Sequence, residues 1–173
     1  MNSVRYVKDR QIQLKDSTVT YTGYVDRDGL PEGHGKQLVK TGSISGATYE
    51  GDHVHGAKDG RGVIKYTNGS SYEGAFKADK RHGFGDYHSG KVEVYVGEYR
   101  EDLKHGIGKA TFPSGDTYEG EWQANSQHGQ GVSTTKAGKM LNLYDMGQLV
   151  KTVTSGRIMS LRCHVYVVEC FGW

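Results

Sequence analysis

Large aromatic residues alternate with glycine and charged residues along much of the chain. In the stretch YEGEWQANSQHGQG, which begins at Tyr118, glutamates separate Tyr118, Gly120 and Trp122. Alternate side chains of an extended strand point to the same face of a sheet, so these three residues share one face and the glutamates share the other. The pattern therefore predicts a strand with an aromatic face and a charged face.

The same pattern returns at a fixed interval. Four copies begin 23 residues apart, at Tyr49, Tyr72, Tyr95 and Tyr118. A looser copy with insertions begins at Tyr21, and a degraded copy without the glycine pair begins at Leu141. A constant period of this length is typical of proteins built from structural repeats.

A glycine pair of the form GxG follows each aromatic run after five or six polar residues, which suit a connecting loop. It opens a second extended run, such as GVIKYTNG at 62–69 or GKATFPSG at 108–115, and each of these runs ends in a turn signal. Each copy is therefore predicted to be a hairpin. Because glycine has no side chain, a ring from one strand can lie on the bare backbone of its neighbour. We expect these ring and glycine contacts to take the place of a central core.

These elements predict an all-β fold, an elongated and twisted antiparallel sheet of successive hairpins that forms an open, single-layer ribbon. Residues 1–20 contain a leading strand at Val4–Leu14 that would cap the array. Residues 21–148 hold about five repeats and a degenerate sixth. Residues 149–173 are the most apolar segment, with VYVVECF as a predicted strand. Three roles for this segment stay open: a cap over the last repeat, an edge that forms a homodimer, and an amphipathic membrane anchor.

Composition supports a repeat protein and excludes several classes. Hydrophobic residues make up 35% of the 173 residues, which is low for a central core but suits a solenoid. Fifteen of the 26 glycines occupy the repeat positions, unlike the scatter of a disordered chain. The N-terminal stretch lacks the apolar centre of a signal peptide, and no run approaches the roughly 20 apolar residues of a membrane span. We therefore expect a cytoplasmic protein.

No recurring motif predicts catalysis. The glycine pairs lack the third glycine and the helix of a nucleotide-binding loop, and neither GxxxxGK[ST] nor GxSxG occurs. The repeated carboxylates of Glu50, Glu73 and Glu119 are expected on a solvated face. We therefore predict that the chain is not an enzyme and needs no cofactor.

Histidines and cysteines do not form a convincing metal site. His82, His105 and His128 occupy one repeat position, so we expect them about 10 Å apart along an edge of the ribbon, too far to share a metal. They are predicted to close the hairpins against backbone, or to form a pH-sensitive row. Cys163 and Cys170 have no second pair of ligands at metal-binding spacing.

Two surfaces are candidates for binding. Basic residues gather near the predicted hairpin turns, and these are Lys77, Lys80, Arg81, Arg100 and Lys104. Acidic neighbours dilute their field, which favours an ordinary solvated surface over a site for acidic phospholipid. No concentrated positive face predicts nucleic-acid binding.

The aromatic face is the stronger candidate, because tyrosine and tryptophan supply much of the energy of typical protein interfaces. Its rings, which would contact a helix or an extended peptide of a protein partner, are Tyr49, Tyr72, Phe76, Tyr95, Tyr99, Tyr118 and Trp122. The alternative is that these rings form the internal core, above all Tyr72, Tyr95 and Tyr118.

The repeated unit resembles the MORN repeat (membrane occupation and recognition nexus), whose pattern is close to YEGEWxxGxxHGxGxxxxxxGxx. The resemblance covers Tyr21 to Met140 and extends to Gln148. His53 departs from it by replacing a bulky aromatic, Gly90 stands two places early, and the first repeat carries insertions, so we expect local irregularity there.

The resemblance implies a non-catalytic scaffold or adaptor that holds a protein partner and links it to membrane or cytoskeleton. Two alternatives follow from the same resemblance. One is a peripheral module that binds acidic phospholipids, and the other is a regulatory module for a separate enzyme.

Overall fold

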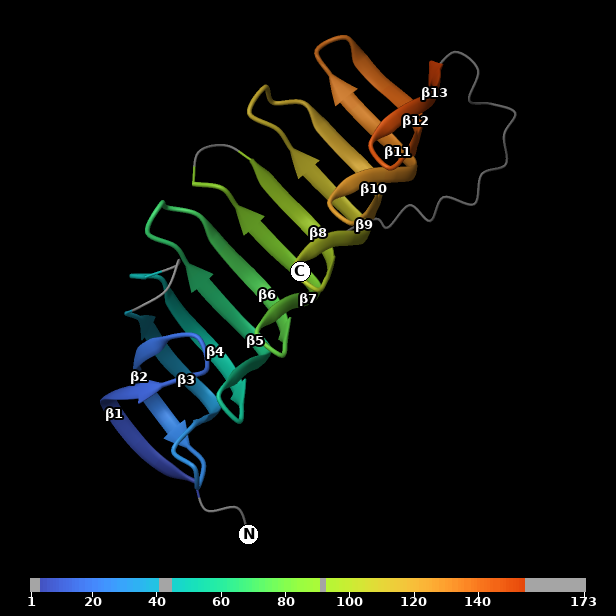
Figure 1. Ribbon diagram of the computed structural model, residues 1–173. Coiled ribbons are helices and arrows are strands. Elements are labelled where there is room, and N and C mark those ends of the chain that lie inside the picture. Colours follow the sequence, from blue (N-terminus) through green and yellow to red (C-terminus); the bar gives the residue numbers. More distant parts are fainter. Residues whose placement is uncertain (1–3, 41–44, 91–92, 155–173) are drawn as a thin grey trace, which may run out of the picture.

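The computed structural model describes residues 4–40, 45–90 and 93–154, and these residues form one antiparallel sheet (Figure 1). Its thirteen strands are hydrogen-bonded in the order of the sequence, without a crossover. Figure 1 shows a long twisted ribbon, with β1 near one end and β13 at the other, and no second layer over the described strands. The prediction of an all-β, open ribbon of hairpins is confirmed.

The strands in chain order are β1 Arg5–Gln13, β2 Thr18–Val25, β3 Pro31–Val39, β4 Thr48–Val54, β5 Ala57–Lys65, β6 Ser71–Lys77, β7 Lys80–His88, β8 Val94–Arg100, β9 Leu103–Thr111, β10 Thr117–Gln123, β11 Ser126–Thr135, β12 Gly138–Asp145 and β13 Gln148–Thr154. The predicted strand VYVVECF and both cysteines lie outside the described residues. The same is true of most of segment 149–173, whose three predicted roles therefore stay predictions.

Two-residue turns close five hairpins along one edge of the sheet, from β4–β5 to β12–β13, whereas residues 26–30 form a five-residue loop between β2 and β3. β6 continues to Lys77 and β7 begins at Lys80, so only Ala78 and Asp79 form the turn. Both turn residues have positive φ, 47° and 70°, which is the geometry that matches the twist of a hairpin. The polar segment predicted to be a loop of five or six residues is therefore mostly strand. That prediction was wrong because polar residues also occupy the solvent-facing positions near a strand end.

Glycines face one another across ten consecutive strands, from β2 to β11. Gly97, for example, pairs with Gly85 on one side and with Gly108 on the other. A Cβ added at Gly108 would overlap the ring of Tyr95. The expectation that the rings lie on bare backbone is confirmed. The full row is Gly23, Gly35, Gly51, Gly62, Gly74, Gly85, Gly97, Gly108, Gly120 and Gly131.

Ten rings form a continuous ladder above these glycines, on the side that we call the aromatic face. In order they are Tyr21, His53, Tyr49, Phe76, Tyr72, Tyr99, Tyr95, Trp122, Tyr118 and Tyr144. Neighbouring rings meet edge to face, with centroids 5.1–5.4 Å apart. Each such pair contributes roughly 0.5–1.5 kcal/mol beyond the burial of apolar area. The imidazole of His53 takes the place of a bulky ring without interrupting the ladder, so the irregularity expected at that residue is absent.

Candidate functional site: a cleft on the aromatic face

The seven rings predicted to contact a partner are buried. Their exposed fractions lie between 0 and 6% for Tyr49, Tyr72, Phe76, Tyr95, Tyr99, Tyr118 and Trp122. Glycine backbone covers one side of these rings and neighbouring rings of the ladder cover their edges. This burial corrects the expectation that the whole row of rings offers a contact surface, because neighbouring groups cover the ring faces. Of the seven, Tyr99 alone also lines the cleft described below. The rings form the core.

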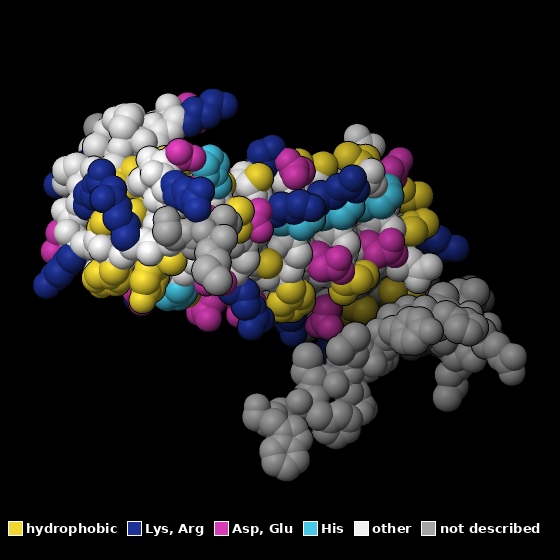
Figure 2. Space-filling model, turned by 90° about the horizontal axis from the view of Figure 1, so that it is seen from below, with side chains coloured by type: hydrophobic (Ala, Val, Ile, Leu, Met, Phe, Trp, Pro, Cys, Tyr) yellow, Lys and Arg dark blue, Asp and Glu magenta, His cyan; other side chains and the backbone are white. Residues whose placement is uncertain are grey.

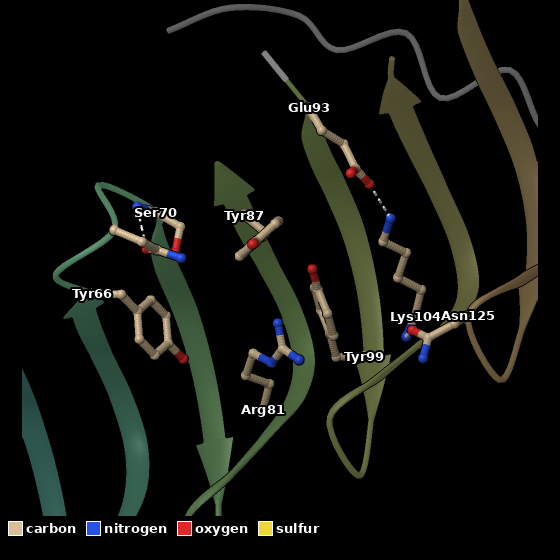
Figure 3. A pocket seen from close by; sticks show the side chains of 9 residues that line it. Tyr66, Ser70, Arg81, Tyr87, Glu93, Tyr99, Lys104 and Asn125 are labelled. Carbon is tan, nitrogen blue, oxygen red and sulfur yellow. Dashed lines mark hydrogen bonds and ion pairs between the residues drawn. The ribbon is translucent and has the colours of Figure 1, made fainter. Parts of the chain in front are cut away.

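A second set of aromatic side chains is only partly buried and packs against this ladder. Tyr66 follows β5, Tyr87 lies in β7 and Phe112 follows β9. Two of these rings border an open cleft of about 410 Å³ on the aromatic face (Figure 3). The residues that line it are Tyr66, Asn68, Ser70, Arg81, Tyr87, Glu93, Tyr99, Lys104 and Asn125. The cleft brings together three of the residues singled out from the sequence, one ring and two cations.

The two cations of the cleft lie over rings of the core. Arg81 and Lys104 are the cross-strand partners of Phe76 and Tyr99, so all four side chains point to the aromatic face. The guanidinium carbon of Arg81 is 4.9 Å from the centroid of Tyr99. The ammonium nitrogen of Lys104 is 4.9 Å from the centroid of Tyr95. Such contacts attract a cation to the face of the ring, and they hold both side chains at the floor of the cleft.

Each cation also has an acidic partner. The Arg81 Nε donates to Asp102 Oδ1 at 3.1 Å, and Nη2 donates to the carbonyl oxygen of Asp102 at 2.8 Å. Lys104 Nζ donates to Glu93 Oε1 at 2.8 Å. The cations are therefore held in place, with part of their hydrogen-bonding capacity still directed at the cleft.

The hydroxyl of Tyr99 is the unusual group of the cleft. The residue is 3% exposed, and its hydroxyl has no hydrogen-bond partner among the described residues. Figure 3 shows it between Tyr87 and the ion pair of Glu93 with Lys104. Burial raises the pKa of Tyr99 well above its ordinary value, so the hydroxyl keeps its proton at any physiological pH and can donate it.

The five basic residues considered for lipid binding do not form one patch. Register places Lys77, Lys80 and Arg100 on the face opposite the rings, whereas Arg81 and Lys104 point to the aromatic face. Lys80 pairs with Glu101, and the ion pair raises the pKa of Lys80 and lowers that of Glu101. Three of the five cations are thus paired with acids, and the group is divided between two faces.

Histidine side chains gather in a stripe beside a row of Lys and Arg side chains (Figure 2). His82, His105 and His128 occupy the same position of β7, β9 and β11, two strands apart. His82 Nδ1 lies 4.0 Å from Glu101, and His128 Nδ1 lies 3.7 Å from Asp145. These two contacts place the imidazoles of His82 and His128 beside the turn region of the next hairpin, where they help to join neighbouring units.

A further group that could hold a metal ion consists of Asp26, Asp28 and His55, whose ligand atoms lie within 4.8 Å of one another. Both carboxylate oxygens of Asp26, the central residue of this group, already contact other protein groups. Asp26 Oδ1 accepts hydrogen bonds from the backbone of Asp28 and Leu30, and Oδ2 lies 2.6 Å from His55 Nδ1. Burial alone would raise the pKa of Asp26, but these bonds hold it below its ordinary value. The group locks two neighbouring turns together.

Two repeated polar positions were missed from the sequence. Carboxylates three residues after the repeat tyrosine accept a backbone N–H from the GxG segment, as Glu98 does from Ile107 at 3.0 Å. Side chains seven residues after the tyrosine accept a backbone N–H of the preceding hairpin, as Asp102 does from Arg81 at 3.0 Å. The signal was present, because Asp79, Asp102 and Asn125 recur with the 23-residue period. Repeating Asp or Asn near a turn indicates a turn-closing role.

The family model for one known repeat agrees with this architecture. No helix with the length and hydrophobicity of a membrane span occurs in the ranges that the structure describes. A comparison with curated proteins found no match. The family model for the MORN repeat matches five segments, 21–43, 49–71, 72–91, 95–117 and 118–140, which together cover more than half of the chain. The chain therefore belongs to the MORN repeat family.

Proposed function

We propose that the protein is a non-catalytic scaffold or adaptor that binds a protein partner in the cleft of the aromatic face. Repeats of this family are in general modules for interaction with proteins or membranes. One observation carries the proposal for this chain: the seven rings predicted to contact a partner are buried, whereas Tyr66 and Tyr87 border an open cleft that also contains Arg81 and Lys104. Partly exposed tyrosines beside cations are characteristic of protein contact surfaces.

The size of the cleft favours an extended segment of the partner. A volume of about 410 Å³ accepts a few side chains and not a small globular surface. The long open sheet leaves room on either side for the rest of that segment (Figure 1). In this proposal the array is a rigid support, and a bound partner is linked through it to membrane or cytoskeleton in the cytoplasm.

A matched pair of ring deletions tests the proposal. Tyr87→Ala removes a wall of the cleft, and Ala110, which fills the equivalent position of the next unit, shows that the strand accepts alanine there. Phe84→Ala removes a ring that is 62% exposed on the opposite face. Each variant and the wild type serve as bait for affinity capture, with bound proteins identified by mass spectrometry.

We expect Tyr87→Ala to lose a specific partner by about tenfold or more, as for a central interface residue, while Phe84→Ala keeps it. Thermal unfolding and circular dichroism establish that both variants are folded. The reverse pattern, with capture lost on Phe84→Ala and kept on Tyr87→Ala, would move the binding surface to the opposite face and refute the proposal.

A further inference from the structure

We propose that the cleft recognises an acidic side chain of a protein partner, with the carboxylate bound by Arg81, Lys104 and the hydroxyl of Tyr99. This inference rests on the proposed function and adds the chemistry of the segment that binds. The three groups come from β7, β8 and β9, and all of them line the cleft (Figure 3).

The first argument is the unpaired hydroxyl of Tyr99. The hydroxyls of Tyr72, Tyr95 and Tyr118 each donate to a backbone carbonyl, at 2.9–3.1 Å. The residues equivalent to Tyr99 in the neighbouring units are Phe76, which has no hydroxyl, and Trp122, whose Nε1 donates to the Gly108 carbonyl at 3.0 Å. A buried donor without an acceptor is costly. Tyr21 Oη, His53 Nδ1 and His82 Nδ1 also lack a partner among the described residues, but of these four groups only the Tyr99 hydroxyl belongs to a residue that lines the cleft. An acceptor atom from a ligand would satisfy this group.

The second argument is that the cleft offers hydrogen-bond donors and few acceptors. The Asn68 side-chain oxygen accepts from Ser70, and that of Asn125 accepts from the backbone of Lys104 at 2.9 Å. Backbone N–H donors fix these two oxygens, so the amide NH₂ groups remain to donate. Arg81 Nη1 and two protons of Lys104 are available as well. A ligand that fits this set presents acceptors, as a carboxylate does.

The third argument is that a carboxylate already occupies part of the cleft. Glu93 Oε1 lies 2.8 Å from Lys104 Nζ. This ion pair shows that Lys104 can bind a carboxylate in this position, and it makes Glu93 a competitor of any incoming acid. Removing the charge of Glu93 should therefore strengthen binding of an acidic segment and leave its site unchanged.

The recessed position of the cations favours a peptide over a lipid surface. The side chains of Arg81 and Lys104 are only 24% and 17% exposed, and both lie on the floor of the cleft. A flat layer of headgroups meets protruding cations, whereas a single Asp or Glu side chain on an extended backbone can enter a recess. Tyr66 and Tyr87 border the same cleft and suit apolar residues that flank the acid.

The test uses the full-length protein and a phage-displayed library of 12-residue peptides. Selected peptides are synthesised with a fluorescent label, and their affinities are measured by fluorescence polarisation. We expect the binders to share an Asp or Glu whose replacement by Asn or Gln lowers affinity about tenfold, as for loss of a charge-assisted hydrogen bond. Lys104→Gln should weaken binding to a similar extent, and Glu93→Gln should tighten it.

Tyr99→Phe is the decisive variant, because it removes the hydroxyl and keeps the ring of the core. Its thermal midpoint should equal or exceed that of the wild type, since no hydrogen bond is lost, while peptide affinity falls about tenfold. Tyr95→Phe is the matched control. It removes a hydroxyl that donates to Glu98, so the thermal midpoint should fall while peptide affinity is kept.

The outcomes separate this inference from the proposed function. Peptides that require Tyr87 but bind equally well without their acids, or bind Tyr99→Phe unchanged, overturn the acidic recognition and leave the cleft as the binding site. Peptides whose affinity is unchanged by Tyr87→Ala overturn both the acidic recognition and the proposed binding site in the cleft. Vesicles containing 20% phosphatidylserine are added to the complex of protein and peptide. If they displace the peptide from the wild type but not from Tyr99→Phe, the cleft binds a lipid headgroup, and the proposal of a peptide ligand is overturned. A selection that yields no binder dependent on the Tyr99 hydroxyl also overturns it.

Discussion

At the scale of single residues, stability depends on the contact between a tyrosine ring and a glycine of the next strand. Tyr95 is fully buried although it belongs to a single-layer sheet, because Gly97 and Gly108 allow its ring to lie on the backbone. The hydroxyl then reaches the carbonyl of Glu98 at 3.1 Å, beside the register shift of β8 against β9. The tyrosine supplies the buried apolar area and the glycines supply the space for its ring. A substitution of either residue type alone would therefore disrupt the contact.

Gly108→Ala tests this contact. The added Cβ would overlap the Tyr95 ring, and we expect the free energy of unfolding to fall by about 3 kcal/mol, as for an overpacked core. Gly115→Ala is the matched control. Nothing lies within 4 Å of a Cβ there, so only its positive φ of 85° opposes the change, at a cost of about 1 kcal/mol. Urea unfolding followed by tryptophan fluorescence measures both, and equal losses would contradict the packing argument.

At the scale of the hairpin, neighbouring units are joined by side chains at the turns. Asp102 lies in the turn between β8 and β9, yet its side chain and its backbone N–H both bond to Arg81 of β7. Asn125 makes the equivalent bond to the backbone of Lys104, one unit further along the sheet. The turn of each hairpin thus binds the hairpin before it, and the array gains a link in addition to the strand pairing.

Substitutions of Asp102 separate the side chain from the turn geometry. Asp102→Gly keeps a residue that tolerates positive φ and the backbone bonds to Arg81, but it loses the two bonds that the side-chain carboxylate accepts from Arg81, so we expect a loss of about 2 kcal/mol. Asp102→Asn retains the bond to the backbone, as Asn125 does, and should cost less than half as much. Amide hydrogen exchange gives a local measurement, because the Arg81 N–H should exchange faster in Asp102→Gly alone. Protection that is equal in both variants would show that the side chain does not hold the units together.

The hairpins, their period and the pairing of ring with glycine were predictable because each depends on local pattern. The alternation of Tyr118, Gly120 and Trp122 determines which side chains of the strand share a face. The GxG pair indicates the neighbouring strand on which the rings lie. Burial of the rings was not decided by the sequence, since it depends on how closely successive hairpins approach. The cleft was missed for a related reason. Tyr66 and Tyr87 fall outside the strict repeat positions, and only the register brings them beside Arg81.

At the scale of the whole molecule, the core consists of two clusters that meet at one histidine. The N-terminal cluster contains Val19, Tyr21 and Val25, and the larger cluster begins at Tyr49. His53 lies between them, with its ring centroid 5.3 Å from that of Tyr21 and 5.1 Å from that of Tyr49. The residue is 1% exposed, so the contact between the clusters includes a buried imidazole.

This position makes the junction sensitive to acid. Burial lowers the pKa of His53 from 6.5 to about 4. Between these values the unfolded chain binds a proton that the folded chain excludes, so stability falls as the pH drops from 6.5 to 4. The full effect is about 3 kcal/mol, at roughly 1.4 kcal/mol for each pH unit. Because repeat arrays unfold in segments when one interface weakens, the loss should be concentrated at the junction between the two clusters.

We therefore expect one urea transition at pH 7 and two at pH 4.5, the first of which unfolds residues 5–39. Hydrogen exchange at pH 4.5 identifies the segment, which should lose protection before residues 49–145. His53→Phe places an uncharged ring in the ladder, as Phe76 does in the next unit, and should restore a single transition at pH 4.5. His88→Gln changes an exposed histidine and should keep two. If His53→Phe also unfolds in two steps at pH 4.5, the weak junction has another origin, and the imidazole is not what couples the first strands to the rest of the sheet.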